Sequence, residues 1–253
     1  VLVLFPSIIL PKKLSLELGG KNATIVLDDA DMQQAVDGAV RAAFTNSGQV
    51  CLCGSRILVQ ARIAEEFNAA FVKAVSSMKI GAPGDEESQI GTVISMEHLN
   101  KVESYIDLAM EEGGTILTGG TRAMTGRLGP DHNGAYLAPT VVAGLSHLSR
   151  CATEEIFGPV VTIHTFETLQ EATEMANATE YGLAGSIWTA DTAKGKALAQ
   201  TIDTGIVWVN TWLHRDLRTP FGGVKNSGVG REGGQWSMGF FSETTNICVK
   251  DQN

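Results

Sequence analysis

The chain has 253 residues, of which 43% are hydrophobic and 19% are charged, so it can bury a sizeable core in one large domain or two small ones. The formal net charge of −9 and the isoelectric point near 5.0 disfavour a nucleic-acid or anionic-membrane partner, because both are negatively charged. The 4 cysteines are too few for a disulfide framework and favour a reducing compartment, the cytoplasm.

The first ten residues, Val1 to Leu10, are almost wholly apolar. This run is too short to span a bilayer. A secretory signal peptide carries basic residues before its apolar run, whereas Lys12 and Lys13 follow this one. A chain that opens without Met inside an apolar run is interpreted as a fragment or as a product of altered splicing.

Beyond Pro11, short apolar segments alternate with segments of helical spacing. Strands are predicted at 14–18, 24–27, 56–59, 136–142, 160–166, 185–188 and 205–210. Helices are predicted at 32–44, 63–78, 96–112, 169–178 and 192–202, the first of them after the N-cap residues Asp28, Asp29 and Asp31. Loops are predicted at 81–89 and 118–134. The alternation predicts an α/β fold with a parallel or mixed sheet and covering helices.

The last apolar segment, 240–249, alternates in character and has no helix after it. It is predicted to be an edge strand that pairs with another subunit, which makes the protein a homo-oligomer.

Two residues in distinctive settings carry the candidate chemistry. Cys51 ends the run Phe44-Thr45-Asn46-Ser47-Gly48-Gln49-Val50-Cys51, and Glu17 lies in Leu16-Glu17-Leu18-Gly19-Gly20-Lys21. A thiolate attacks carbonyl carbon, and a carboxylate within reach can accept a proton. The alternatives are a buried apolar cysteine and a solvated glutamate. Cys53 forms a C-x-C pair with Cys51, but no second cysteine or histidine pair completes a tetrahedral set, so no metal site is predicted.

Four separate motifs resemble the aldehyde dehydrogenase superfamily in order and spacing, over about residues 12 to 250. They are Leu-Glu-Leu-Gly-Gly-Lys, Phe-x-x-x-Gly-Gln-x-Cys, Glu154-Glu155-Ile156-Phe157-Gly158-Pro159, and the closing stretch Pro220 to Gly228 with Gly230-Arg231-Glu232. The resemblance implies oxidation of an aldehyde to a carboxylate through a cysteine thioester, with NAD or NADP as hydride acceptor.

The same resemblance assigns roles to individual residues. Cys51 is the implied nucleophile, and its backbone N–H forms half of an oxyanion hole. Glu17 is the implied general base, chiefly for the water that cleaves the thioester. The implied cofactor-binding residues are Leu18, Gly19, Glu155 and Phe157, with Glu155 on a ribose hydroxyl and Phe157 beside the nicotinamide.

Residues 210–220 are expected beside the aldehyde tunnel, and they contain Arg215 and Arg218. A guanidinium binds a carboxylate bidentately, so the pair suggests a carboxylated substrate, with Arg215 favoured as its anchor. This segment and Cys51-Leu52-Cys53 resemble the 2-aminomuconic and 2-hydroxymuconic semialdehyde dehydrogenases, which implies an unsaturated dicarboxylic semialdehyde. The alternative is a salt bridge from either arginine to Asp216 or to another surface acid.

A full family member carries a further N-terminal half, with most of the dinucleotide-binding domain. The expected organisation is therefore a remnant of that domain at 1–18, a catalytic domain at 19–224 and a C-terminal segment at 225–253. Because that half is expected to hold most of the cofactor site, NAD binding by this chain alone is not expected, which leaves two alternatives to a dehydrogenase. One is a non-catalytic fragment that pairs with full-length subunits, and the other is a residual thiol esterase that needs Cys51 and Glu17 but no hydride acceptor.

Overall fold

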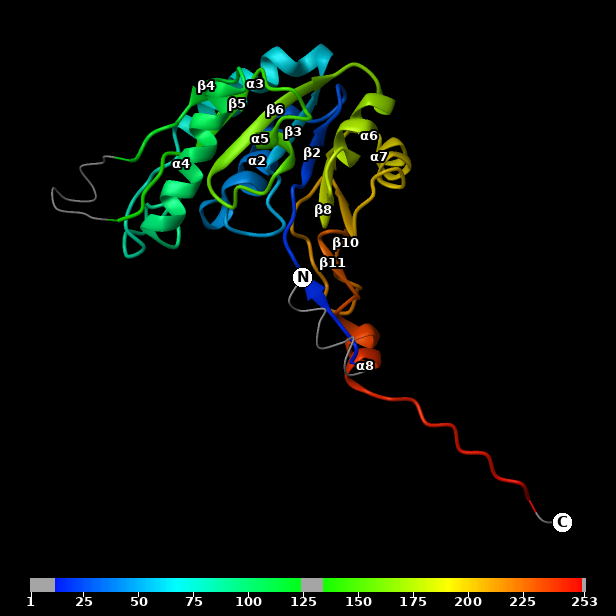
Figure 1. The fold of residues 1–253 in the computed structure, drawn as a ribbon. Coiled ribbons are helices and arrows are strands. Elements are labelled where there is room, and N and C mark those ends of the chain that lie inside the picture. The colour runs from blue at the N-terminus through cyan, green and yellow to red at the C-terminus, as the bar shows by residue number, and fades with distance from the viewer. Residues whose placement is uncertain (1–11, 124–133, 252–253) are drawn as a thin grey trace.

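A central sheet with helices on both faces organises the chain (Figure 1). The computed structural model describes residues 12–123 and 134–251, so the apolar start and residues 124–133 of the predicted loop lie outside the described residues. Within the described residues, 7 strands form the sheet in the order β4-β5-β6-β3-β2-β8-β9. Every neighbouring pair is parallel except β4 with β5, which confirms the predicted α/β class. The strands are β2 (Ala23–Val26), β3 (Arg56–Gln60), β4 (Thr115–Thr118), β5 (Thr140–Ala143), β6 (Val160–Phe166), β8 (Ala184–Trp188) and β9 (Ile206–Val209).

Both faces of the sheet are buried under helices. Ile57 and Val59 of β3 pack in the cluster that contains α2 (Met32–Phe44) and α3 (Ala61–Ser76). Leu58, between them, packs in a different cluster with α6 (Leu169–Asn177) and α7 (Thr192–Ala199). A third cluster joins α4 (Met96–Glu111) to β5 and β6. Successive side chains of a strand point to opposite faces, so the continuous apolar run in β3 follows from burial on both sides.

The predicted helices form with shifts of no more than three residues at their ends. Asp31 caps α2 as expected, because its side chain accepts a hydrogen bond from the backbone N–H of Gln34. The strand predicted at 136–142 begins only at Thr140, because Pro139 has no N–H to donate to a neighbouring strand. Short elements that were not predicted include the strand β4, the 3₁₀ helix η1 (Thr45–Gly48) and the helix α5 (Arg150–Thr153).

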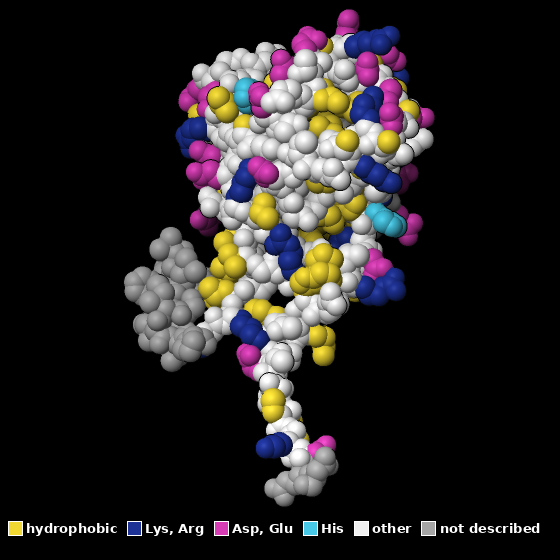
Figure 2. Space-filling model, turned by 90° about the vertical axis from the view of Figure 1, so that its right-hand side faces the viewer, with side chains coloured by type: hydrophobic (Ala, Val, Ile, Leu, Met, Phe, Trp, Pro, Cys, Tyr) yellow, Lys and Arg dark blue, Asp and Glu magenta, His cyan; other side chains and the backbone are white. Residues whose placement is uncertain are grey.

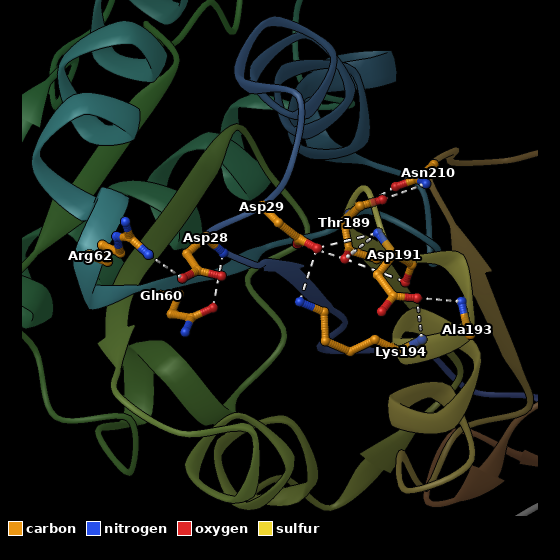
Figure 3. Close-up of polar contacts among 9 residues, drawn as sticks. All are labelled: Asp28, Asp29, Gln60, Arg62, Thr189, Asp191, Ala193, Lys194 and Asn210. Carbon is orange, nitrogen blue, oxygen red and sulfur yellow. Dashed lines mark hydrogen bonds and ion pairs between the residues drawn. The ribbon is translucent and has the colours of Figure 1, made fainter.

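The carboxyl ends of β2, β8 and β9 are tied together by polar side chains (Figure 3). Thr189 donates to Asp29 through its hydroxyl (Oγ1 to Oδ1, 2.7 Å), and the Lys194 ammonium lies 2.9 Å from the other oxygen of Asp29. The amide of Asn210 accepts from the N–H of Thr189 and donates to its carbonyl (2.9 and 2.8 Å). This network fixes the end of the sheet at which these three strands stop.

The C-terminal part adds two small antiparallel pairs below the sheet (Figure 1). β1 (Leu16–Glu17) pairs with β11 (Gly228–Val229), and β7 (Tyr181–Gly182) pairs with β10 (Val224–Lys225). The helix α8 (Gly234–Phe241) follows, and residues 242–251 extend from it without regular structure.

The segment predicted to pair with another subunit, 240–249, therefore forms no strand in the single chain. Its first two residues lie in α8, and the rest forms no ladder, because an edge strand needs a partner strand to hydrogen-bond with. Figure 2 shows this segment as a narrow extension of the body, and its apolar side chains Phe241, Ile247 and Val249 are more than 80% exposed. Among the described residues, no helix is long and apolar enough to cross a membrane.

Two cations lie side by side in the interior. The Arg56 guanidinium donates to the carbonyls of Lys21, Met175 and Ala176 (2.9, 2.6 and 2.7 Å), so its charge is solvated by backbone oxygens. The Lys21 ammonium is equally buried but has no hydrogen-bond partner among the described residues. Burial, followed by repulsion from Arg56, lowers the pKa of Lys21 to about 7.

Replacing Lys21 by Met is expected to stabilise the chain, because it keeps the length of the side chain and removes a buried, unpaired polar group. The expected gain in the free energy of unfolding at pH 7 is about 1–2 kcal/mol. The unfolded state binds a proton below pH 10.5, whereas the folded state does so only near pH 7, so wild-type stability should fall as the pH drops from 10.5 to about 7. Urea unfolding across this range should show the fall in the wild type and lose this component in Lys21→Met; parallel profiles would contradict it.

Candidate active site

Three motifs lie close together because they lead into the amino ends of three adjacent parallel strands. The segment with Glu17 precedes β2, the segment with Cys51 precedes β3, and the segment with Glu155 precedes β6. β2 pairs with β3 and β3 pairs with β6, both in parallel, so the three amino ends lie next to one another. The sheet therefore gathers residues that are far apart in the sequence.

Gly48 and Gln49 hold the backbone of the loop before Cys51 in place. Gly48 has a φ of +72°, and a Cβ there would lie 2.1 Å from the carbonyl oxygen of Gly158, so only glycine fits. The side chain of Gln49 accepts from the N–H of Ile94 (2.9 Å) and donates to the carbonyl of Thr92 (3.4 Å). These contacts give the spacing Gly-Gln-x-Cys a physical basis, since they anchor the loop on both sides.

Cys51 is half-buried and lies in a negative electrostatic environment. Burial, the charge of Glu17 and the charge of Glu155 all raise the pKa of its thiol. Hydrogen bonding by its own backbone N–H and the charge of Arg215 act in the opposite direction. The structure thus brings together the predicted nucleophile, the predicted base, one predicted cofactor residue and one predicted substrate residue within electrostatic range.

Glu17 sits on β1 at the mouth of this region. Burial and the charge of Glu232 raise the pKa of its carboxyl, while a hydrogen bond from the Gly223 N–H and the charges of Arg231 and Arg215 lower it. The net shift is upward, which makes the carboxylate a better proton acceptor. Sequence reasoning did not single out Glu232, although it stands in the closing motif Gly230-Arg231-Glu232.

The four residues predicted to bind cofactor divide into two settings. Glu155 accepts a hydrogen bond from the N–H of Gly20 (2.9 Å), and a Cβ on Gly19 would lie 2.4 Å from its carboxylate, so the glycine pair permits this contact. Leu18 is exposed and donates its N–H to Ser227. Phe157 has a φ of +60°, an uncommon value for a bulky residue. His98 hydrogen-bonds the Phe157 carbonyl and holds its ring edge-on to that aromatic ring.

The two predicted substrate residues lie in different surroundings. The Arg215 guanidinium stacks on the Phe221 ring at 4.1 Å and lies 3.9 Å from Glu232, with 34% of its side chain exposed. Arg218 is 87% exposed and its guanidinium is engaged by Asp216. The salt-bridge alternative is thus realised by Arg218 with Asp216, and of the two arginines only Arg215 affects the pKa values of both Cys51 and Glu17.

The other cysteines differ from Cys51. Cys53 is buried, and burial raises the pKa of its thiol to about 12. All four cysteines are free thiols. Within residues 12–123 and 134–251, no group of three His, Cys, Asp or Glu side chains is placed to hold a metal ion.

Comparison with known proteins places this geometry in context. The sequence profile described as "Aldehyde dehydrogenase family" matches residues 9–247. A 2-aminomuconic 6-semialdehyde dehydrogenase from Pseudomonas sp is 46% identical over 240 residues, which cover 94% of this chain and 48% of that protein. The 2-aminomuconic semialdehyde dehydrogenase of Homo sapiens is 43% identical over 239 residues, with 94% and 49% covered. The chain spans about half the length of these curated relatives.

Solved structures agree with the sequence comparison. The crystal structure of a betaine aldehyde dehydrogenase from Staphylococcus aureus, in complex with NAD+, has a TM-score of 0.89 and 39% identity, covering 98% of this chain and 51% of that chain. An aldehyde dehydrogenase from Bacillus cereus gives a TM-score of 0.90 at 35% identity, covering 96% of this chain and 48% of that chain. With the profile matched over nearly its whole length, the chain belongs to the aldehyde dehydrogenase family.

Proposed function

We propose that this chain carries the thiol and the base of an NAD-dependent aldehyde dehydrogenase, with Cys51 as nucleophile and Glu17 as general base. The observation that carries the proposal is that the segments with Glu17, Cys51 and Glu155 enter the adjacent parallel strands β2, β3 and β6 at the same end of the sheet. The family membership supports it independently.

The residues divide the chemistry between them. The Cys51 thiolate adds to the aldehyde carbon, and the N–H of Cys51 donates to the oxygen that becomes negative. After oxidation, Glu17 accepts a proton from the water that attacks the thioester, a role that suits its raised pKa. Because Glu17 raises the pKa of Cys51, its charge disfavours the thiolate, and we assign it to the water rather than to the thiol.

The residues present fit one end of a dinucleotide. Gly19 lets the Glu155 carboxylate lie against the backbone before β2, where that carboxylate can accept from a ribose diol, and Phe157 provides an aromatic ring. Bound NAD+ would supply the acceptor for the hydride. NAD+ is present in the Staphylococcus aureus relative, and this supports NAD as the cofactor.

The substrate is proposed to be an acidic semialdehyde of the 2-aminomuconic type, with Arg215 as anchor for its carboxylate. Arg215 is oriented by Phe221, and its ion-pair contact among the described residues is a long one, to Glu232, so within this part of the chain its donors are available for a carboxylate. Arg218, the other arginine predicted to bind substrate, is not proposed as an anchor, because its guanidinium already hydrogen-bonds to Asp216.

The test of this function uses the 253-residue chain with p-nitrophenyl acetate. A burst of p-nitrophenolate and an acetyl group on the Cys51 peptide by mass spectrometry are expected, with neither in Cys51→Ser. Fluorescence titration with NAD+ then decides whether this chain alone binds cofactor. A chain without acyl-enzyme would refute Cys51 as the nucleophile, and a chain without NAD+ binding would limit it to thiol esterase chemistry.

Replacing Glu17 by Gln is expected to make Cys51 ionise at lower pH, because a negative charge that raises the pKa of the thiol is removed. The rate of Cys51 alkylation by iodoacetamide, followed across pH, should shift to lower pH in Glu17→Gln. Release of the acyl group from Cys51 should slow at least tenfold in the same variant, since the water loses its base. A shift of alkylation to higher pH would instead assign Glu17 to activation of the thiol.

Arg215→Ala is expected to weaken reaction with acidic substrates selectively. Loss of a charge-assisted hydrogen bond of about 1.5–3 kcal/mol corresponds to roughly a 10- to 100-fold fall in kcat/KM. Acylation by a p-nitrophenyl ester that carries a second, free carboxylate should fall by this factor relative to p-nitrophenyl acetate. Arg218→Ala is the matched control and should change neither ester, whereas an equal loss on both esters in Arg215→Ala would remove the anchor role.

Association through 240–249 is a second proposal, supported by the exposed apolar side chains of this segment. A chain that ends at Ser242 should then sediment as a smaller species than the 253-residue chain in analytical ultracentrifugation. Identical sedimentation of the two would count against pairing through this segment.

A further inference from the structure

Asn22 joins three segments of the site through one buried amide. Its Nδ2 donates to the carbonyl oxygens of Cys51 (2.8 Å) and Cys53 (2.9 Å), and its Oδ1 accepts from the N–H of Ala184 (2.9 Å). The side chain is 4% exposed, so water does not replace these bonds. The amide therefore uses both donors and its acceptor inside the fold.

These bonds fix the direction of the peptide groups around the nucleophile. The carbonyl before Cys51, that of Val50, accepts from the N–H of Cys53 (2.8 Å), while the carbonyl of Cys51 itself is held by Asn22. The next carbonyl, that of Leu52, accepts from the Trp212 indole (3.0 Å). A peptide group is planar, so pinning the carbonyls on both sides of Cys51 restricts its φ and ψ and the direction of its N–H.

Close packing reinforces the contact. A Cβ on Gly20 would lie 2.7 Å from the Cys51 carbonyl oxygen and 2.9 Å from Asn22 Oδ1, so only glycine lets the chain before β2 approach the turn. The same short stretch carries Glu17 five residues before Asn22. A shift of this stretch relative to the turn would move base and nucleophile apart.

We infer that Asn22 is a positioning residue of the proposed reaction: it holds the Cys51 turn so that the thiol and the Cys51 N–H face the same carbonyl group. This inference rests on the proposed function, because it concerns the reaction proposed for Cys51. It assigns no chemistry to Asn22 itself. Asn22 acts through Cys51, and its loss should impair attack on a carbonyl more than attack on a reagent that needs no oxyanion contact.

The experiment compares two reactions of the same thiol in Asn22→Ala. With p-nitrophenyl acetate, the thiolate forms a carbon–sulfur bond, the carbon–oxygen bond to the leaving group breaks, and p-nitrophenolate departs with the electron pair. The rate constant of the burst should fall at least tenfold. Alkylation by iodoacetamide at pH 7 should not fall, because a looser turn admits water and the burial that raises the pKa of Cys51 decreases.

Asn177→Ala is the matched control. The Asn177 amide also donates to a carbonyl, that of Thr201, and accepts from a backbone N–H, that of Asp203, both at 2.8 Å. It should lower the urea midpoint but leave the burst rate and the alkylation profile unchanged. Asn22→Ser, whose hydroxyl can donate to one of the two carbonyls, should be intermediate, and it serves as the test variant if Asn22→Ala does not fold.

The possible results distinguish a failure of the role inferred for Asn22 from a failure of the function proposed for Cys51. A burst rate in Asn22→Ala within twofold of the wild type, or a parallel fall of burst and alkylation, would overturn the positioning role. A wild type without any burst would refute the proposed function instead. The contact of Asn22 with the Cys51 turn would then be tested by the pH profile of Cys51 alkylation, which should move to lower pH in Asn22→Ala and not in Asn177→Ala.

Discussion

The parallel pairing of β2, β3 and β6 is the constraint on which the candidate site depends. Parallel strands cannot be joined by a hairpin, so each strand is entered from a separate crossover, and the entering segments meet at one edge. Those segments carry Glu17, Cys51 and Glu155. Ile57 and Leu58 are both buried, on opposite faces, so a shift in register would exchange the side chains of two close-packed clusters. Core packing therefore sets the geometry of the site.

Sequence patterns predicted those helices and strands that are specified by residues within the segment itself. The cap Asp31, the helical spacing of α2 and the apolar run of β3 each specify their structure within a few residues. The strand predicted at 14–18 forms only over Leu16–Glu17, as β1, because its length is set by pairing with β11, more than two hundred residues later. The segment 240–249 alternates in the same way but forms no strand, because no other strand among the described residues pairs with it.

The site also depends on two residues with positive φ, Gly48 and Phe157, and only one of these conformations can be predicted from the sequence. The positive φ of Gly48 can be expected from the sequence, because glycine adopts such a φ without strain. The positive φ of Phe157 cannot be expected, because a phenylalanine with a φ of +60° costs roughly 1–2 kcal/mol that surrounding contacts must offset. The His98 bond to the Phe157 carbonyl is one such contact. Motif resemblance located Phe157, but only the structure gives its strain.

The electrostatics of the site connect reactivity with selectivity. Glu17 and Glu155 both raise the pKa of Cys51, and they would also repel an acidic substrate from a chain of net charge −9. Arg215 opposes both effects, because its charge lowers the pKa values of Cys51 and Glu17 and attracts a carboxylate. An acidic substrate that pairs with Arg215 would partly neutralise that charge and so raise the pKa of the thiol it is about to meet. Binding of an acidic group and ionisation of the thiol would then oppose each other through one guanidinium, each weakening the other by the same free energy.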